Sequence, residues 1–179
     1  MFQDIQPHVL KNQNEQQRSP RPGDYILIGR QQQVLLQDGT LPKYEAVAQD
    51  WQFDADQYQY LLAVDEAAFF WVDVTATATN QYTVGSTKQF RDLKPAWLAF
   101  SSATAAHLAW WYDTNRFCGH CGQPLHPGSA ERSLVCAACG QTILSHDYAS
   151  DYRRCHERGQ ITDDEVPVRL QLLFADFWL

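Results

Sequence analysis

Short apolar runs bounded by turn residues predict β-strands in the first half of the chain. Residues 25–28 and 34–36 form two such runs, and the segment 37–40 that follows them contains Asp-Gly, a strong hairpin signal. Two longer aromatic-rich runs at 58–64 and 68–74 flank an Asp-Glu pair and predict another hairpin. We expect the aromatic side chains of these runs to pack in a core and not to form a ligand platform.

The second half begins with a pattern of helical period. Residues 97–115 predict a helix. The candidates for its buried face are Trp97, Phe100, Leu108 and Trp111. Residues 1–23, in contrast, are largely polar and rich in Gln, Asn and Arg, and indicate a mobile lead-in. Strands followed by one long helix predict an α+β fold, with a β-rich N-terminal domain and a connecting helix.

Composition and charge narrow the class of protein. No apolar run in the 179 residues is long enough to span a bilayer, and the first ten residues lack the basic and apolar regions of a signal peptide. These features predict a cytoplasmic protein that does not enter the membrane. The net charge of −7 argues against a general nucleic-acid-binding protein, which would present a basic face.

Two Cys-x-x-Cys pairs, separated by fourteen residues, are the strongest chemical signal in the sequence. A glycine follows each pair and can supply the positive φ that closes a tight turn around the sulfurs, a zinc knuckle. Four thiolates at ~2.3 Å from a zinc ion make a closed tetrahedral site without an open position, so the metal would be structural. The candidate ligands are Cys118, Cys121, Cys136 and Cys139.

Other interpretations of these cysteines were weighed. Two disulfides fit poorly with paired Cys-x-x-Cys motifs and no secretion signal, and a thioredoxin-like redox motif would need one pair at a strand–helix junction. His120 and His126 are alternative ligands, although exposed loop histidines are the simpler interpretation because four thiolates already fill the shell. Cys155 has no partner pair and is interpreted as an incidental thiol.

At this point the sequence resembles a known family. The run from Trp111 to Gly122, with Glu131 five residues before Cys136, is similar to the N-terminal half of the NADH pyrophosphatases. These are Nudix-superfamily hydrolases that also act on NAD-capped RNA, and in them a β-rich domain, a helix and a four-cysteine ribbon precede the Nudix domain. The segments 38–42 and 84–88 resemble the family's early Leu-Pro turn and its Gly-Ser-x-Arg segment.

The resemblance implies a division of the chain into four parts. They are a lead-in (1–23), an N-terminal domain with its helix (24–115), a zinc ribbon (116–143) and a tail without family likeness (144–179).

The resemblance also implies roles for particular residues. It implies zinc ligation by the four cysteines and, more weakly, substrate contacts by Glu131 and by Lys88, which stands where the family has arginine. A solvated ribbon residue is an equal interpretation of Glu131. For Lys88 a surface role is favoured, since lysine offers a point charge where arginine's planar fork can hold a phosphate at two points. A homodimer, NAD(H) or NAD-capped RNA as substrate, and Mg or Mn as cofactor are implied by the family alone.

The sequence departs from the family after the ribbon. A Nudix box places several carboxylates on one helix beside a glycine, and no stretch of these residues does so. The acidic run 163–165 is better interpreted as a helix start. Without such ligands the chain lacks Lewis-acid activation and charge neutralisation at the phosphates, so we expect it to be catalytically inert alone.

A change of reading frame offers an explanation for the tail. With allowed codons for residues 144–155, removal of one T gives YPTIMPAIIVG, which resembles the strand that follows the ribbon in the family. We therefore predict one inserted T near the codons of Ile143 and Leu144. On this interpretation residues 144–179 carry little functional weight.

Three functions follow from these observations. The first is a truncated protein similar to NADH pyrophosphatase, with the ribbon kept and the catalytic box lost. The second is a stand-alone zinc-ribbon module for protein interaction or dimerisation. The third, a nucleic-acid-binding ribbon, is the weakest because of the acidic balance of the chain.

Overall fold

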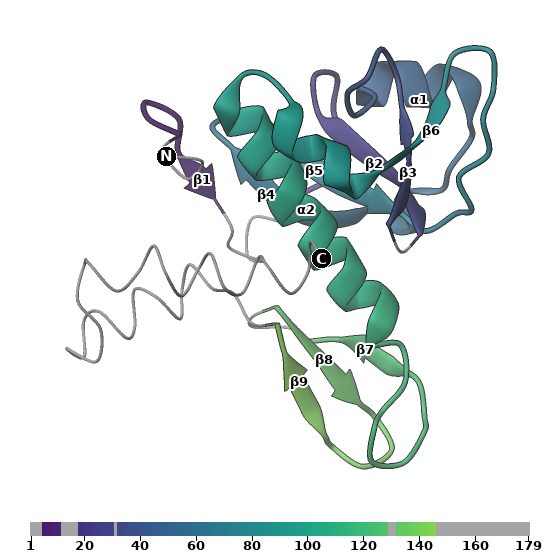
Figure 1. The fold of residues 1–179 in the computed structure, drawn as a ribbon. Helices are drawn as coiled ribbons and strands as arrows, with labels where there is room; N and C mark the ends of the chain where they lie inside the picture. The colour runs from purple at the N-terminus through teal and green to yellow at the C-terminus, as the bar shows by residue number, and fades with distance from the viewer. Residues whose placement is uncertain (1–4, 12–17, 31, 129–131, 146–179) are drawn as a thin grey trace. The chain divides into compact units, whose positions relative to one another are not determined.

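The computed structural model describes residues 5–11, 18–30, 32–128 and 132–145 (Figure 1). The chain divides into two compact units, Met1–Ile143 and Leu144–Leu179. Only Leu144 and Ser145 of the second unit are described, so the predictions for the tail, including Cys155 and the acidic run 163–165, lie outside the described residues. The predicted α+β class, with a β-rich domain, a helix and a cysteine ribbon, is confirmed.

A mixed six-stranded sheet forms the N-terminal domain, in the order β1-β4-β5-β2-β3-β6. The strands are β1 (Leu10–Lys11), β2 (Tyr25–Arg30), β3 (Gln33–Leu36), β4 (Gln59–Val64), β5 (Ala67–Val72) and β6 (Thr83–Ser86). The β2–β5 pair at the centre is parallel, whereas the other pairs are antiparallel. Two short 3-10 helices, η2 (Ala55–Gln57) and η3 (Thr87–Asp92), precede β4 and follow β6.

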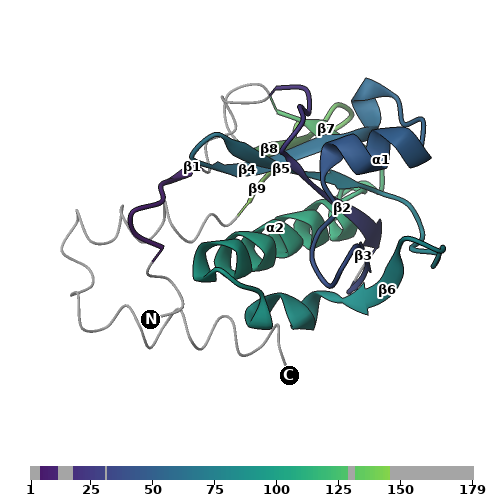
Figure 2. The ribbon, with the colours of Figure 1, turned by 90° about the horizontal axis from the view of Figure 1, so that it is seen from above.

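Helices cover the two faces of this sheet. Figure 2 shows α2 (Ala96–Thr114) on one face and α1 (Tyr44–Asp50) on the other. Because successive side chains of a strand point to opposite faces, Leu27 packs in the core beneath α2 while Ile28 packs in the core that includes Val47 of α1. Both faces of the central strands are therefore buried, which explains why β2, β4 and β5 are nearly continuous apolar runs and do not alternate.

The two predicted turns are confirmed by their backbone angles and pairing. Asp38 and Gly39 have φ of 50° and 76°, as a two-residue hairpin turn requires, and Gln37 and Thr40 exchange hydrogen bonds of 2.9 and 3.0 Å. The second turn, at Asp65 and Glu66, joins β4 to β5. Local turn chemistry thus sets these two connections.

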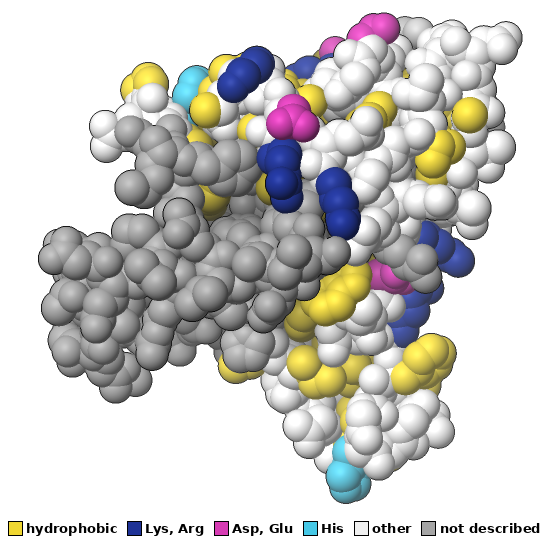
Figure 3. All heavy atoms as spheres, viewed as in Figure 1, with side chains coloured by type: hydrophobic (Ala, Val, Ile, Leu, Met, Phe, Trp, Pro, Cys, Tyr) yellow, Lys and Arg dark blue, Asp and Glu magenta, His cyan; other side chains and the backbone are white. Residues whose placement is uncertain are grey.

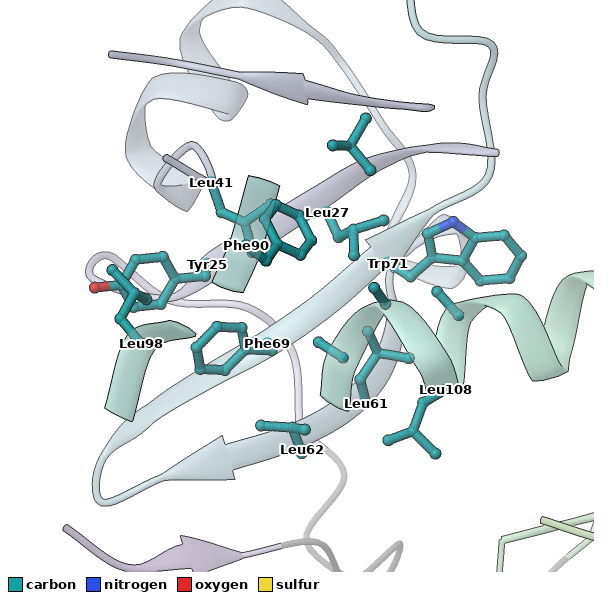
Figure 4. Packing of buried hydrophobic residues seen from close by; sticks show 14 of the residues in the cluster. Tyr25, Leu27, Leu41, Leu61, Leu62, Phe69, Trp71, Phe90, Leu98 and Leu108 are labelled. Carbon is teal, nitrogen blue, oxygen red and sulfur yellow. The ribbon is translucent and has the colours of Figure 1, made fainter. Parts of the chain in front are cut away.

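Helix α2 confirms the predicted helix, and small residues extend its buried face. Leu108 and Trp111 are buried as expected, and Trp97 is partly buried and packs against the core cluster beneath α2. Phe100 is only half-buried and is not a member of that cluster. Small residues take the central positions against the sheet, including Ala105, Ala106 and Ala109. They allow the helix backbone to approach the strands, and Figure 4 shows Leu98 beside Tyr25 and Leu108 near Leu61 in the same cluster.

Part of the segment 1–23 is attached to the domain. Leu10–Lys11 forms β1 and pairs with β4 at the sheet edge. Arg18 forms an ion pair with Asp24, which is only 2% exposed and also accepts the backbone N–H of Ala68 at 2.8 Å. These contacts connect two points of the segment to the hairpin β4–β5. Among the described residues, none of the helices combines the length and apolar character that a membrane span needs.

Candidate metal centre

The ribbon consists of two turns with the same backbone pattern and a small sheet. The N–H of Cys118 donates to Gln123 O at 2.7 Å, and the N–H of Gly122 returns to Cys118 O at 2.8 Å. The second turn repeats this between Cys136 and Gln141, at 2.9 Å, and between Gly140 and Cys136, also at 2.9 Å. The strands are β7 (Leu125–Pro127), β8 (Ser133–Cys136) and β9 (Thr142–Leu144), in that order.

Each turn closes on a glycine with positive φ. Gly122 has φ of 72° and Gly140 has φ of 74°, values that L side chains adopt only with strain. The glycines that follow the two Cys-x-x-Cys pairs therefore have the conformational role that the sequence predicts. The backbone in each turn directs two thiols toward the other turn.

The four thiols meet at one point. Cys121 Sγ lies 3.4 Å from Cys136 Sγ and 3.5 Å from Cys139 Sγ, and Cys118 Sγ lies 3.6 Å from Cys139 Sγ. The four sulfurs all lie within 4.8 Å of one another. Zinc–sulfur bonds of ~2.3 Å at tetrahedral angles place sulfurs about 3.8 Å apart, so the arrangement fits a four-thiolate zinc site.

The geometry does not fit the alternatives considered for these cysteines. All four are free, and their separations greatly exceed the ~2.05 Å of a disulfide bond. Among the described residues, the cluster able to hold a metal consists of the four cysteines, with neither His120 nor His126 in it. Both histidines are exposed, and His126 lies on β7 opposite Val135.

The charges of the thiols also favour a cation. Backbone N–H groups, above all that of Cys139, lower the pKa of the Cys136 thiol to about 7. Those of its own turn, led by the N–H of Cys121, lower the pKa of Cys118. The backbone N–H of Gln141 lowers the pKa of the Cys139 thiol. Desolvation and hydrogen bonds with the neighbouring thiols outweigh this effect and raise that pKa to about 12. Four thiolates so close together repel one another when no cation is present. A bound dication offsets this repulsion and deprotonates its thiol ligands.

The thiols differ in exposure. Cys118 and Cys136 are 3% and 0% exposed, whereas Cys121 and Cys139 lie at the surface. One side of the cluster therefore faces the protein interior and the other faces solvent.

The remaining predicted site residues lie elsewhere or are not described. Lys88 is an exposed residue of η3, and its N–H donates to Ser86 Oγ at 3.3 Å as part of the helix cap. Glu131 lies outside the described residues. The structure therefore locates Lys88 without testing its predicted substrate contact.

Two arginines that the sequence analysis did not single out connect the ribbon to the N-terminal domain. Arg116, just before the first turn, lies 2.7 Å from Asp73 at the end of β5 and also pairs with Asp113. Arg132, just before β8, is 7% exposed and donates to the backbone carbonyl of Leu61 in β4. Nothing in the local sequence marks the contacts with the N-terminal domain, because Asp73 and Leu61 are distant in the chain from the two arginines.

The fold and the thiol cluster together define a zinc-ribbon protein: an α+β domain continued by a long helix into a four-cysteine ribbon with a structural zinc site. Residues 113–143 match the family described as the NADH pyrophosphatase zinc ribbon domain. This match includes all four cysteines of the cluster.

Comparison with curated proteins extends the similarity upstream of the ribbon. The chain is 26% identical over 113 residues to the NAD-capped RNA hydrolase NudC of Klebsiella pneumoniae subsp. pneumoniae, covering 63% of this chain and 41% of the relative. The NudC of Citrobacter koseri gives the same values. That of Salmonella paratyphi B is 34% identical over 60 residues, which are 34% of this chain and 23% of the relative. The chain thus spans about two fifths of the length of the Klebsiella and Citrobacter relatives.

Proposed function

We propose that these residues form the N-terminal and zinc-ribbon portion of a protein of the NADH pyrophosphatase type, with Cys118, Cys121, Cys136 and Cys139 as ligands of a structural zinc ion. The observation that carries the proposal is the coincidence of the thiol cluster with the matched ribbon, residues 113–143. The match ends at Ile143, where the first compact unit also ends, which supports the boundary between ribbon and tail.

The proposed reaction class is hydrolysis of the diphosphate of NAD(H) or of an NAD cap. Water adds to one phosphorus as the bridging P–O bond breaks. The products are NMN(H) and AMP from NAD(H), and NMN and an RNA with a 5′-monophosphate from an NAD cap. Divalent Mg or Mn would neutralise the phosphates, which requires several carboxylates around the metal. The sequence offers no glycine-led helix with such carboxylates, so we propose that the 179 residues do not carry out this step alone.

An assay of the purified 179-residue chain tests this proposal. With NADH and Mg or Mn, we expect NMNH formation at the level of a protein-free blank, together with one zinc per chain. The full-length Klebsiella pneumoniae relative is the positive control. Turnover that follows this chain through purification and is lost with chelation of Mg would contradict the proposal.

The substrate contacts belong to the same proposal. We infer that Glu131 contacts the nucleotide, as the family resemblance implies; the resemblance implies the same contact for Lys88, for which a surface role is favoured. Titration of the chain with NADH, followed by nucleotide fluorescence, should then show binding that Glu131→Gln and Lys88→Gln weaken. Identical binding curves for both variants and the parent chain would assign these residues to the surface.

A second function is an interaction module, favoured by exposed apolar side chains near the ribbon. Phe117, next to the first ligand, is 64% exposed, and Trp110 of α2 is 40% exposed. Figure 3 shows hydrophobic side chains at the surface over the C-terminal end of α2 and the adjoining ribbon. Aromatic residues of this kind are enriched in protein interfaces.

Sedimentation equilibrium tests this second function as self-association. A dimer that Phe117→Ser disperses would support it, with Val84→Ser as the control. Val84 is 41% exposed but lies on β6, at the opposite edge of the N-terminal sheet from β1. A monomer at all concentrations would exclude the homodimer.

A further inference from the structure

Strand β4 contains an irregularity at the point where the ribbon contacts it. Tyr60 pairs with Phe70 and Leu62 with Phe69, so Leu61 is an extra residue with no partner in β5. The side-chain pattern shows the same β-bulge, because the consecutive residues Leu61 and Leu62 both pack in the core beneath α2 (Figure 4). A bulge leaves its extra residue outside the ladder of the strand pair.

The ribbon supplies a donor to this bulge. The Arg132 guanidinium donates through Nη2 to the carbonyl of Leu61, and its Nη1 lies 3.5 Å from the hydroxyl of Tyr112 on α2. Arg132 is 7% exposed, so its charge is largely removed from water. Burial of a guanidinium is costly unless such hydrogen bonds are made. The contact therefore depends on accurate placement of the Arg132 backbone.

The position of Arg132 depends in turn on the ribbon fold. Ser133 follows it and opens β8, which ends at the thiol of Cys136. The carbonyl of Ser133 accepts the N–H of Gly128 at 2.8 Å, and a Cβ on Gly128 would lie only 2.0 Å from Ser133 Oγ. Leu125, at the other end of β7, pairs with Cys136. The β7–β8 pair, which positions Arg132, thus ends at Cys136, a residue of the metal cluster.

A ribbon this small has little core of its own. Zinc-binding modules of such size fold when the metal binds, so metal loss would release the β7–β8 pairing. We propose that Arg132 couples zinc occupancy of the ribbon to the stability of the bulged strand β4 in the N-terminal sheet. Zinc binding completes the turn that presents Arg132, and the guanidinium then holds the carbonyl of Leu61. The inference rests on zinc binding by the four thiols and not on any hydrolase activity.

Coupling of this kind is reciprocal. If zinc-loaded ribbon stabilises β4 through Arg132, then removal of the guanidinium weakens zinc binding by the same factor. We expect Arg132→Gln to raise the zinc Kd by about tenfold, within the usual range of coupling between two sites. Arg132→Lys, which retains the positive charge and one donor nitrogen in place of three, should recover part of the loss.

Hydrogen exchange measured by mass spectrometry tests the proposal in the full chain. Zinc removal from the wild type should accelerate exchange in β4 (Gln59–Val64) more than in the β2–β3 segment. Zinc-loaded Arg132→Gln, with its metal content confirmed by elemental analysis, should show the same acceleration in β4. Arg116→Gln is the matched control, because Arg116 contacts Asp73 and Asp113 but makes no described contact with β4.

Three results would overturn the coupling. One is wild-type exchange in β4 that does not change when zinc is removed, a comparison that needs no variant. Another is wild-type protection of β4 in zinc-loaded Arg132→Gln. The third is an equal acceleration in all strands, which would indicate global destabilisation. A chain that binds no zinc would instead refute the proposed metal centre itself, so the two failures are distinguishable.

Discussion

The Nη2 atom of Arg116 lies 2.7 Å from Oδ2 of Asp73, so the residue that leads into the ribbon is ion-paired with the end of the central strand β5. Asp73 also accepts Arg30 from the end of β2, and Arg116 also pairs with Asp113. Two arginines and two carboxylates thus form one ion-pair network at the C-terminal end of α2. Its side chains range from 15% to 49% exposed, and this exposure to solvent limits the contribution of each ion pair to the stability of the fold.

Loss of this network should cost a modest amount of stability. We expect Asp73→Asn to lower the free energy of unfolding by about 1 kcal/mol, the upper range for a solvent-exposed ion pair. Urea denaturation followed by tryptophan fluorescence measures the change. Asp56→Asn, at an exposed carboxylate in η2, is the control and should change little. Equal stabilities of the two variants would show that the Asp73 pairs are energetically neutral.

The knuckle glycines allow a matched test of backbone strain. Gly122→Ala and Gly140→Ala each place a Cβ in open space, but force an L residue to φ above 70°. We expect a cost of about 1 kcal/mol each, or roughly fivefold in zinc affinity. Gly119→Ala is the control, since its Cβ also meets nothing and its φ is not in the left-handed region. Competition with a chromophoric chelator gives the affinities, and equal values for all three variants would contradict the role of φ.

Ligand substitutions separate the cysteines from the nearby histidines. Cys136→Ser should abolish stoichiometric zinc binding, because a structural four-thiolate site contributes about 10–16 kcal/mol of apparent binding free energy. The double variant with His120→Ala and His126→Ala should retain one zinc per chain, as both side chains lie outside the thiol cluster. Elemental analysis after dialysis provides the measurement. Loss of zinc from the histidine variant would require a mixed ligand set.

The reading-frame hypothesis concerns the gene and stays a prediction. We expect one T beyond the family frame near the codons of Ile143 and Leu144, followed by a frame that encodes a strand and then a Nudix-like segment. Sequencing the locus through and beyond these codons decides the matter. A downstream region without such a frame would refute the hypothesis.

Local patterns were sufficient for the elements and for the metal cluster. The Asp-Gly turn, the two apolar hairpin strands and the long helix depend on neighbouring residues, and the cysteine spacing with its glycines encodes both knuckles. The prediction that the two thiol pairs face each other followed from the tetrahedral coordination of zinc, which requires all four sulfurs to surround one ion.

Long-range packing could not be predicted in the same way. The β2–β5 pairing, the packing of small alanines of α2 against the sheet, and the contact of Arg132 with Leu61 all join distant segments. The bulge in β4 breaks the two-residue period by one position, and the continuous apolar run from Tyr60 to Val64 conceals this break. Such features depend on tertiary packing, because no short-range pattern in the sequence specifies them.

The parallel pairing of β2 with β5 has a consequence for how the chain folds. Tyr25 is aligned with Phe69, so a long intervening segment must be closed before the centre of the sheet can form. The adjacent hairpin β4–β5 closes a far shorter loop and is the natural nucleus. During synthesis, every strand of the N-terminal sheet leaves the ribosome before the first cysteine pair does. We therefore expect strand pairing to begin before the ribbon can bind its metal.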